Sequence, residues 1–282
     1  MPSPEIIVEP HIHMLSRTTD DYQAMYQAGI RCCIEPSFWV GSPRRHAGTF
    51  YDYFDLILDF ETTRAERFGI DHYAVIAVNP KECDDAGLAT ETLDGIEKYF
   101  DHPRCVGVGE IGFNEITPNE EAAFVRQLHM AEERKLPLMV HSPHRNKRKG
   151  VERIIEILKA ECITMERVDI DHNTEDTIDL VAPLDCWAGM TIYPYSKLDP
   201  KRVVNILKEY GTERMLVNSS ADWGISDPLS LRKAAYNMAA AGFSDEELTK
   251  TLHGNPIEFF SHCDRFQPRL DLVPHAVETF QR

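Results

Sequence analysis

The sequence predicts a single (β/α)8 barrel that spans residues 1–282. Short apolar stretches rich in β-branched residues alternate with amphipathic stretches about eight times, as expected for parallel strands joined by helices. The chain has 282 residues, and one such barrel typically needs about 250. No Gly- or Pro-rich linker divides the pattern, and no Gly-rich phosphate-binding motif follows a strand. We therefore favour one closed barrel over an open doubly wound sheet.

The predicted strands are short apolar runs, six of which end in a polar residue or Pro. They cover residues 6–13, 30–36, 72–78, 105–110, 138–141, 168–172, 187–192 and 215–218. The predicted helices place apolar residues at helical spacing, and Gly29 and Gly69 end the first two. They cover residues 19–28, 51–68, 90–99, 120–134, 149–161, 177–182, 199–210 and 228–241. Short helices at about 245–260 are expected to pack on the barrel.

The composition is that of a globular enzyme with an acidic surface. The chain is 43% hydrophobic and 27% charged, with a formal net charge of −16. Such a surface repels nucleic acid at long range, so we do not expect non-specific binding to duplex DNA. The seven cysteines include no Cys-x-x-Cys pair, which favours reduced thiols in the cytoplasm. No apolar run reaches the roughly 18 residues that span a membrane, and Met1–Glu5 lacks the features of a signal peptide.

Titratable side chains collect where the predicted strands end. In a (β/α)8 barrel the functional side chains lie at the C-terminal ends of the strands, around one mouth. Imidazole and carboxylate groups at that position suit a divalent metal ion. The candidate ligands are His11 and His13 in the first strand, Glu110 in the fourth, His141 in the fifth, His172 in the sixth and Asp222 just beyond the eighth. Asp171 is expected to face away from the mouth, because neighbouring residues of a strand alternate.

Several of these motifs resemble the TatD-related metal-dependent hydrolases of the amidohydrolase superfamily. They are His-x-His at 11–13, Gly-Glu-Ile-Gly at 109–112, Val-His-Ser at 140–142, Asp-His at 171–172 and Gly-Asn-Pro at 254–256. The resemblance covers essentially the whole chain. It extends to the EboB-like branch of the family, which is found beside biosynthetic genes.

The resemblance implies two divalent ions per chain. His11, His13, Glu110 and Asp222 would hold one ion, and Glu110, His141 and His172 would hold the second. Glu110 can bridge the two ions because a carboxylate has two oxygens. Water between the ions would supply the hydroxide nucleophile, with Asp222 as the catalytic proton shuttle. Zn²⁺, Mn²⁺, Fe²⁺, Ni²⁺ and Mg²⁺ all stay open as the metal.

The eighth strand departs from the family pattern. The family usually ends this strand with a Glu-Thr-Asp-like sequence, whereas residues 218–220 read Asn-Ser-Ser and Asp222 follows two positions later. A shift of two residues in extended backbone keeps a side chain on the same face, so Asp222 can still point inward. The alternative is that Asp222 caps the turn that follows it. In the same way, His11 and His13 can be buried structural residues.

A run of positive charge follows the fifth predicted strand. Residues 145–149 read Arg-Asn-Lys-Arg-Lys. Cations at a helix N-terminus oppose the helix dipole, so a binding role is favoured over a solvated helix start. We therefore predict a small anionic substrate, such as a phosphate ester or a carboxylate. The candidate substrate contacts are Arg44, Arg45, His144, Arg145, Lys147, Arg148 and Trp223.

The predicted function is metal-dependent hydrolysis of an anionic ester, phosphoester or amide. A nuclease that cleaves phosphodiesters and a mononuclear deaminase or decarboxylase are the enzymatic alternatives. The non-enzymatic alternative is a metal-binding scaffold component of a biosynthetic pathway, because metal ligands alone do not prove turnover.

Overall fold

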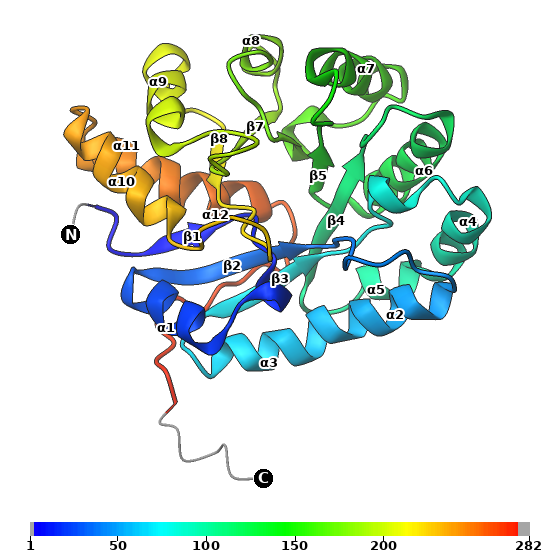
Figure 1. Ribbon diagram of the computed structural model, residues 1–282, viewed down its shortest axis with the longest axis horizontal. Helices are drawn as coiled ribbons and strands as arrows, with labels where there is room; N and C mark the ends of the chain where they lie inside the picture. Colours follow the sequence, from blue (N-terminus) through cyan, green and yellow to red (C-terminus); the bar gives the residue numbers. More distant parts are fainter. Residues whose placement is uncertain (1–2, 276–282) are drawn as a thin grey trace.

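A parallel eight-stranded barrel forms the centre of the molecule (Figure 1). The structure is a computed structural model and describes residues 3–275. The strands are β1 (Ile7–Glu9), β2 (Ile30–Pro36), β3 (Asp71–Val75), β4 (Cys105–Gly112), β5 (Leu138–His141), β6 (Val168–Asp171), β7 (Trp187–Thr191) and β8 (Met215–Asn218). They are hydrogen-bonded in chain order, and each pair is parallel. The predicted (β/α)8 fold is confirmed.

The barrel closes through the residues that follow β1 and β8. The Ser220 N–H donates to the carbonyl of His11 at 2.8 Å, and the His13 N–H donates to the carbonyl of Ala221 at 3.0 Å. We call this pair of hydrogen bonds the seam. Because it lies beyond the last residues of both strands, the seam is at the mouth, beside two candidate metal ligands.

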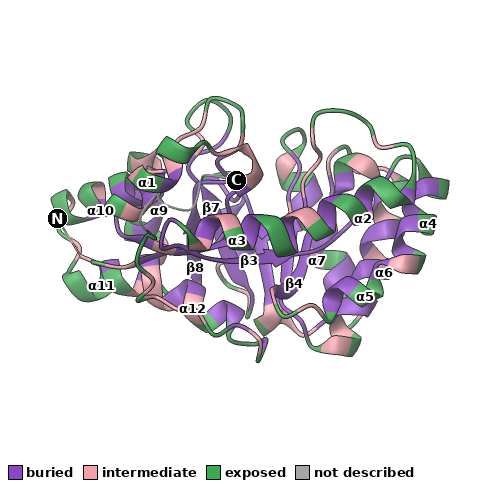
Figure 2. Cartoon of the chain, turned by 90° about the horizontal axis from the view of Figure 1, so that it is seen from below, coloured by how far each residue is buried: buried purple, intermediate pink, exposed green. Residues whose placement is uncertain are grey.

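Helices surround the barrel and bury one face against it, while their outer faces are exposed (Figure 2). They are α1 (Thr19–Gln27), α2 (Ala47–Asp55), α3 (Glu61–Glu66), α4 (Ala86–Gly95), α5 (Glu97–Phe100), α6 (Pro118–Arg134), α7 (Lys147–Ala160), α8 (Ile178–Val181), α9 (Pro200–Tyr210), α10 (Ser230–Ala240), α11 (Asp245–Thr249) and α12 (Asn255–Phe260). The predicted helix at 51–68 corresponds to α2 and α3, joined by a π-helical segment at Leu56–Phe60. Within residues 3–275, no helix is both long enough and apolar enough to cross a membrane.

Capping side chains fix where several loops at the mouth stop. Thr18 and Thr117 each accept a hydrogen bond from the backbone N–H three residues later, and the acidic residue there bonds back to the cap. Asp199 accepts from two backbone N–H groups in the first turn of α9. Each of these residues ends a loop that leaves a strand, so the caps set the length of the loops around the mouth.

The C-terminal segment packs against the opposite end of the barrel, where the strands begin. The Asn255 side chain donates to the carbonyl of Met215, the first residue of β8, at 2.8 Å. Asp71, the first residue of β3, accepts from the backbone of Arg269 at 2.8 Å and from its guanidinium group at 2.7 Å. Phe259 and Phe260 of α12 are fully buried. The tail therefore covers the end of the barrel that faces away from the mouth.

Candidate metal centre

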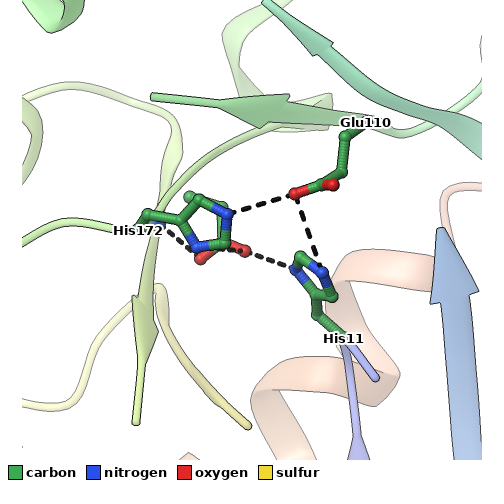
Figure 3. A group of neighbouring side chains, drawn as sticks. His11, Glu110 and His172 are labelled. Atoms are coloured by element: carbon green, nitrogen blue, oxygen red, sulfur yellow. Dashed lines mark hydrogen bonds and ion pairs between the residues drawn. The ribbon is translucent and has the colours of Figure 1, made fainter. Parts of the chain in front are cut away.

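Four buried side chains from three strand ends meet at the mouth. One ligand atom from each of His11, Glu110, Asp171 and His172 lies within 4.8 Å of the others. His11 follows β1, Glu110 lies in β4, and Asp171 and His172 stand at the end of β6. Figure 3 shows the side chains of His11, Glu110 and His172 turned toward a common point. Residues more than 150 positions apart in the chain, such as His11 and Asp171, are brought into contact.

The hydrogen bonds of His11 leave its Nε2 lone pair facing the centre. His11 Nδ1 lies 2.6 Å from Asp171 Oδ2, and a carboxylate only accepts, so Nδ1 carries the proton. In the neutral imidazole, Nε2 is then an acceptor. It lies 3.7 Å from Glu110 Oε1 and 3.3 Å from His13 Nε2.

His172 is oriented in the same way by a chain of side chains. Its Nδ1 lies 2.6 Å from Thr191 Oγ1, and the Thr191 hydroxyl donates its proton to Asn218 Oδ1 at 2.8 Å. The Thr191 oxygen therefore accepts from His172, whose Nε2 keeps a lone pair. That atom lies 3.1 Å from Glu110 Oε1, and burial raises the pKa of the Glu110 carboxyl.

His141 and His13 complete the set of imidazoles. His141 Nδ1 donates to the carbonyl of Phe113 at 2.8 Å, which again leaves Nε2 as an acceptor. The ring of His13 stacks on Phe38 with centroids 4.0 Å apart. Burial holds the pKa of His13, His141 and His172 well below the ordinary value, so these imidazoles are neutral.

This donor set fits a divalent metal ion. His172 Nε2 and His11 Nε2 lie 3.1 and 3.7 Å from Glu110 Oε1, an arrangement of acceptors that a cation between them would stabilise. The ring nitrogens turned away from the centre are held by Asp171, Thr191 and a carbonyl, which is how ligating histidines are usually oriented. His13 Nδ1 is the exception, since it has no hydrogen-bond partner within residues 3–275.

Asp171 corrects one expectation of the sequence analysis, which had it facing away from the mouth. A Cβ added at Gly189 would lie 2.3 Å from Asp171 Oδ1 and 2.8 Å from Asp169 Oδ1, so both carboxylates occupy one face of β6. The neighbouring His172 also reaches the centre because its backbone has a φ of +66°. This left-handed conformation ends the alternation of the strand and turns two consecutive side chains toward the same site.

The centre opens into a cavity of about 230 Å³. Five of the six predicted ligands line it, namely His13, Glu110, His141, His172 and Asp222. His11 lies behind them and is fully buried. The cavity therefore gives a substrate access to the side of the centre on which these five side chains lie.

Asp222 lies in this cavity but outside the cluster of four. Its Oδ1 accepts from the Tyr193 hydroxyl at 2.9 Å and from the Gly224 N–H at 2.8 Å. The second bond closes the turn that the sequence analysis gave as the alternative role of Asp222. Ser220, at the position where the family pattern has its aspartate, lines the same cavity and has a φ of +42°.

Among the cavity side chains that the sequence analysis missed, two contact predicted ligands. Lys197, in the loop after β7, is buried, and its Nζ lies 3.4 Å from His172 Nε2. A lysine in a polar loop ordinarily reaches solvent, so no sequence pattern marked it. Asn79 donates to Glu110 Oε2 at 3.2 Å and thereby orients the carboxylate. The Asn-Pro pair at 79–80 signalled only the end of a strand.

Most of the predicted substrate cations lie away from this cavity. Arg44 forms an ion pair with Glu82, and Arg148 forms one with Asp179 at 2.9 Å. Lys147 donates to the backbone carbonyl of His172 at 3.0 Å. Two further candidates are exposed, Arg45 and Arg145.

Other side chains contribute cations and aromatic surface at the mouth. Lys81 and Lys197 are the lysines that line the cavity, and His144 lines it as well. Trp223 stands at the rim, where it packs against Phe38 with ring centroids 5.0 Å apart. The positive charge beside the centre thus comes mainly from side chains that the sequence analysis did not select.

The fold and the site together define a class of protein. A parallel barrel whose mouth gathers neutral imidazoles and carboxylates around one point is the framework of a metal-dependent hydrolase. Residues 10–260 match the family described as TatD related DNase, and the chain belongs to this TatD family. The protein is therefore a metal-dependent hydrolase of the TatD type.

Individual proteins resemble the chain over nearly its whole length, one in sequence and two in fold. An uncharacterized metal-dependent hydrolase of Methanocaldococcus jannaschii is 24% identical over 259 residues, which cover 90% of this chain and 99% of the relative. A TatD-like protein of Archaeoglobus fulgidus has a similar structure, with a TM-score of 0.73, 22% identity and coverage of 90% and 99%. The phosphotriesterase homology protein of Escherichia coli, solved with phosphate in its active site, gives a TM-score of 0.68 at 19% identity, with coverage of 92% and 99%.

Proposed function

We propose that the protein hydrolyses an ester, phosphoester or amide bond of a small anionic molecule at a centre of two divalent ions. The observation that carries the proposal is the convergence of imidazole lone pairs on Glu110 Oε1, 3.1 Å from His172 Nε2 and 3.7 Å from His11 Nε2. The proposed ligands are His11, His13, Glu110 and Asp222 for one ion and Glu110, His141 and His172 for the other.

The ions and the protein would divide the chemistry. Divalent ions, when bound, act as Lewis acids and lower the pKa of water to about 7, which makes a nucleophile available near neutral pH. Asp222 lies in the cavity with its carboxylate oriented by Tyr193 and Gly224. In the proposal it accepts a proton from the attacking water and passes it to the leaving group.

Charge in the cavity supports an anionic substrate. The ammonium groups of Lys81 and Lys197 face the space beside the centre, in a protein with a formal net charge of −16. The phosphate bound by the Escherichia coli protein belongs to that protein, and it makes phosphoesters a rational first class of substrate to test. The volume of about 230 Å³ suits the reacting group and a few neighbouring atoms.

A second cavity adjoins the first and supports a substrate with an apolar substituent. It has a volume of about 260 Å³ and shares Trp39 and Lys81 with the metal cavity. Phe50 and Leu88 also line it, and both are buried. In the proposal the anionic group lies near the two lysines while an alkyl or aryl group extends past Trp39.

The test combines metal analysis with a substrate screen. The full chain, purified without chelator, is expected to contain divalent metal and to hydrolyse at least one nitrophenyl phosphodiester, phosphomonoester or carboxylic ester with added Mn²⁺ or Zn²⁺. Glu110→Gln should lose both properties. The control is His129→Gln, which removes a half-exposed histidine that pairs with Glu161 on the surface. A Glu110→Gln variant with undiminished metal and activity would refute the proposal.

The name of the matching family favours a second candidate, a nuclease. Single-stranded oligonucleotides labelled at either end belong in the same screen, because a single-stranded end is narrow enough to enter a cavity that excludes a duplex. Cleavage of oligonucleotides at a rate above that of every small ester would favour the nuclease. A protein that binds metal but cleaves none of these compounds would favour the non-enzymatic alternative, a metal-binding scaffold component.

A further inference from the structure

Lys197 is held beside the metal centre by the backbone of a short loop. The Lys197 N–H donates to the carbonyl of Tyr193 at 2.8 Å, and the Tyr193 N–H donates to the carbonyl of Leu198 at 2.8 Å. The Leu198 N–H returns to Thr191, the last residue of β7, at 3.2 Å. Only 8% of Lys197 is exposed. The side chain is therefore directed inward by the fold.

The ammonium group of Lys197 faces an atom that the metal centre also needs. Its Nζ lies 3.4 Å from His172 Nε2, which is an acceptor because Nδ1 of the same ring donates to Thr191. An imidazole nitrogen has one lone pair, so His172 Nε2 cannot bind a metal ion while it accepts a hydrogen bond from lysine. Burial lowers the pKa of Lys197, and the nearby carboxylates of Glu110, Asp171 and Asp222 oppose this shift because they attract the charged ammonium group.

We propose that Lys197 is the resident cation at the position of the second ion. This inference rests on the proposed metal centre and deepens it. One ion binds tightly at His11, His13, Glu110 and Asp222, because this set does not include the His172 lone pair that Lys197 occupies. The second ion binds at His172 only when it displaces the ammonium group of Lys197 from His172 Nε2. The ammonium group then faces the substrate cavity. Lys197 thus sets how many ions the centre holds at a given metal concentration.

The test measures ion binding rather than turnover. The full chain is freed of metal and titrated with Mn²⁺, and free Mn²⁺ is followed by electron paramagnetic resonance. The wild type is expected to bind one Mn²⁺ tightly and a second much more weakly. Lys197→Met should tighten the second site by about 30-fold or more, because a positive charge a few ångströms away is removed from a poorly solvated site. Two ions that share Glu110 should also give a magnetically coupled spectrum.

A matched variant separates this contact from the general effect of charge. Lys81→Met removes a lysine from the same cavity, where Lys81 Nζ lies 3.5 Å from the Trp39 ring centre. It is expected to change the second site by less than about threefold, because Lys81 does not share the His172 lone pair. Lys197→Gln serves as a second variant if the Met variant folds poorly, as judged by circular dichroism of the metal-free chain.

The outcomes distinguish this inference from the proposed function. Equal affinity for two ions in the wild type, unchanged in Lys197→Met and Lys197→Gln, would overturn the role of Lys197 and leave the metal centre standing. The same gain in Lys81→Met as in Lys197→Met would also overturn it. Failure of the wild type to bind even one ion would overturn the metal centre, and the inference with it.

Discussion

Both ends of the barrel bury carboxylates, but the partners of those carboxylates differ. Where the strands begin, the fully buried Asp71 lies 2.9 Å from the guanidinium group of Arg104 and 2.7 Å from that of Arg269. At the mouth, Glu110 is buried against neutral imidazoles, with His172 Nε2 at 3.1 Å. Asp71 therefore has two permanently charged guanidinium groups as neighbours, whereas Glu110 mainly faces the lone pairs of imidazole nitrogens.

The difference indicates that one end stabilises the fold and that the other is suited to bind a cation. A buried charge is tolerated when a cation of the protein compensates it, and removal of one partner is then costly. A buried carboxylate that faces mainly acceptors, with one lysine nearby, is compensated more fully when a further cation arrives from outside. The burial of Asp71 and Glu110 is nearly equal, so the charge of the partner distinguishes the two ends.

The largest expected effect is that of Asp171→Asn at the mouth. Asp171 accepts the Nδ1 proton of His11, whereas an asparagine can donate to Nδ1 and place the proton on Nε2, where it blocks an ion. We expect the affinity for the first ion to fall by about 100-fold. Calorimetric titration with Mn²⁺ measures it. Asp169→Asn, on the same face of β6, is the control, and an equal loss in both variants would contradict the orienting role of Asp171.

At the opposite end, Asp71→Asn is expected to destabilise the fold without changing ion binding. The substitution leaves Arg104 and Arg269 without their shared carboxylate. Both guanidinium groups are partly exposed, so we expect a loss of about 2 kcal/mol in the free energy of unfolding, below the cost for a fully buried pair. Urea unfolding measures the loss. An Asp71→Asn variant that keeps the stability of the wild type but binds metal poorly would contradict the assignment of stability to this end and of binding to the mouth.

Trp39→Ala tests whether the mouth determines specificity at little cost in stability. Trp39 lies between the two cavities and is only partly buried. We expect kcat/KM for an ester with an alkyl or aryl group to fall about tenfold and kcat/KM for its truncated analogue to stay within about twofold. Steady-state kinetics on matched esters provide the measurement. Equal losses on both esters would argue against the apolar subsite.

The smallest of the four main effects is expected for Glu132 in α6, whose carboxylate contacts Thr164 and Arg167 just before β6. Partial burial raises the pKa of Glu132, but bonds from Thr164 and Arg167 outweigh it and hold the pKa below the ordinary value of 4.5. A lowered carboxyl pKa stabilises the fold above the ordinary value and ceases to do so as the pH falls through the lowered pKa. Glu132→Gln should therefore cost about 1 kcal/mol at pH 7 and almost nothing in strong acid.

Urea unfolding of both proteins at several pH values checks this last prediction. A loss for Glu132→Gln that does not change with pH would mean that the carboxylate charge is irrelevant there. The exposed pair of Arg134 and Glu97, tested as Glu97→Gln, should cost less than about 0.5 kcal/mol at any pH.

Much of the fold and most of the centre could be predicted from the sequence, for two physical reasons. Parallel strands buried on both faces are continuous apolar runs, so β2, β5 and β8 were placed with the bounds that the structure shows. The fold then brings the ends of those runs to one mouth. This is why Glu110 and His172, far apart in the chain, could be paired in advance.

The remaining features depend on backbone geometry and on tertiary contacts, which a pattern does not contain. The φ of +66° at His172 turns two consecutive side chains inward, against the alternation of a strand. Lys197 is directed inward by hydrogen bonds of its own loop. Arg148 reads as an anion-binding residue until the fold supplies Asp179 as its partner. In each case backbone geometry, the hydrogen bonds of a loop or a partner distant in sequence overruled the local pattern.

The seam of the barrel has a mechanical consequence. The last two backbone hydrogen bonds that join the ends of the sheet are made by His11 and His13 themselves, with Ser220 and Ala221 across the junction. A metal ion bound by those two imidazoles would stabilise the closed junction, and opening of the junction would move the imidazoles apart. Metal binding and closure of the barrel are thus coupled. The amide protons of His13 and Ser220 should exchange with solvent more slowly when the metal ion is bound.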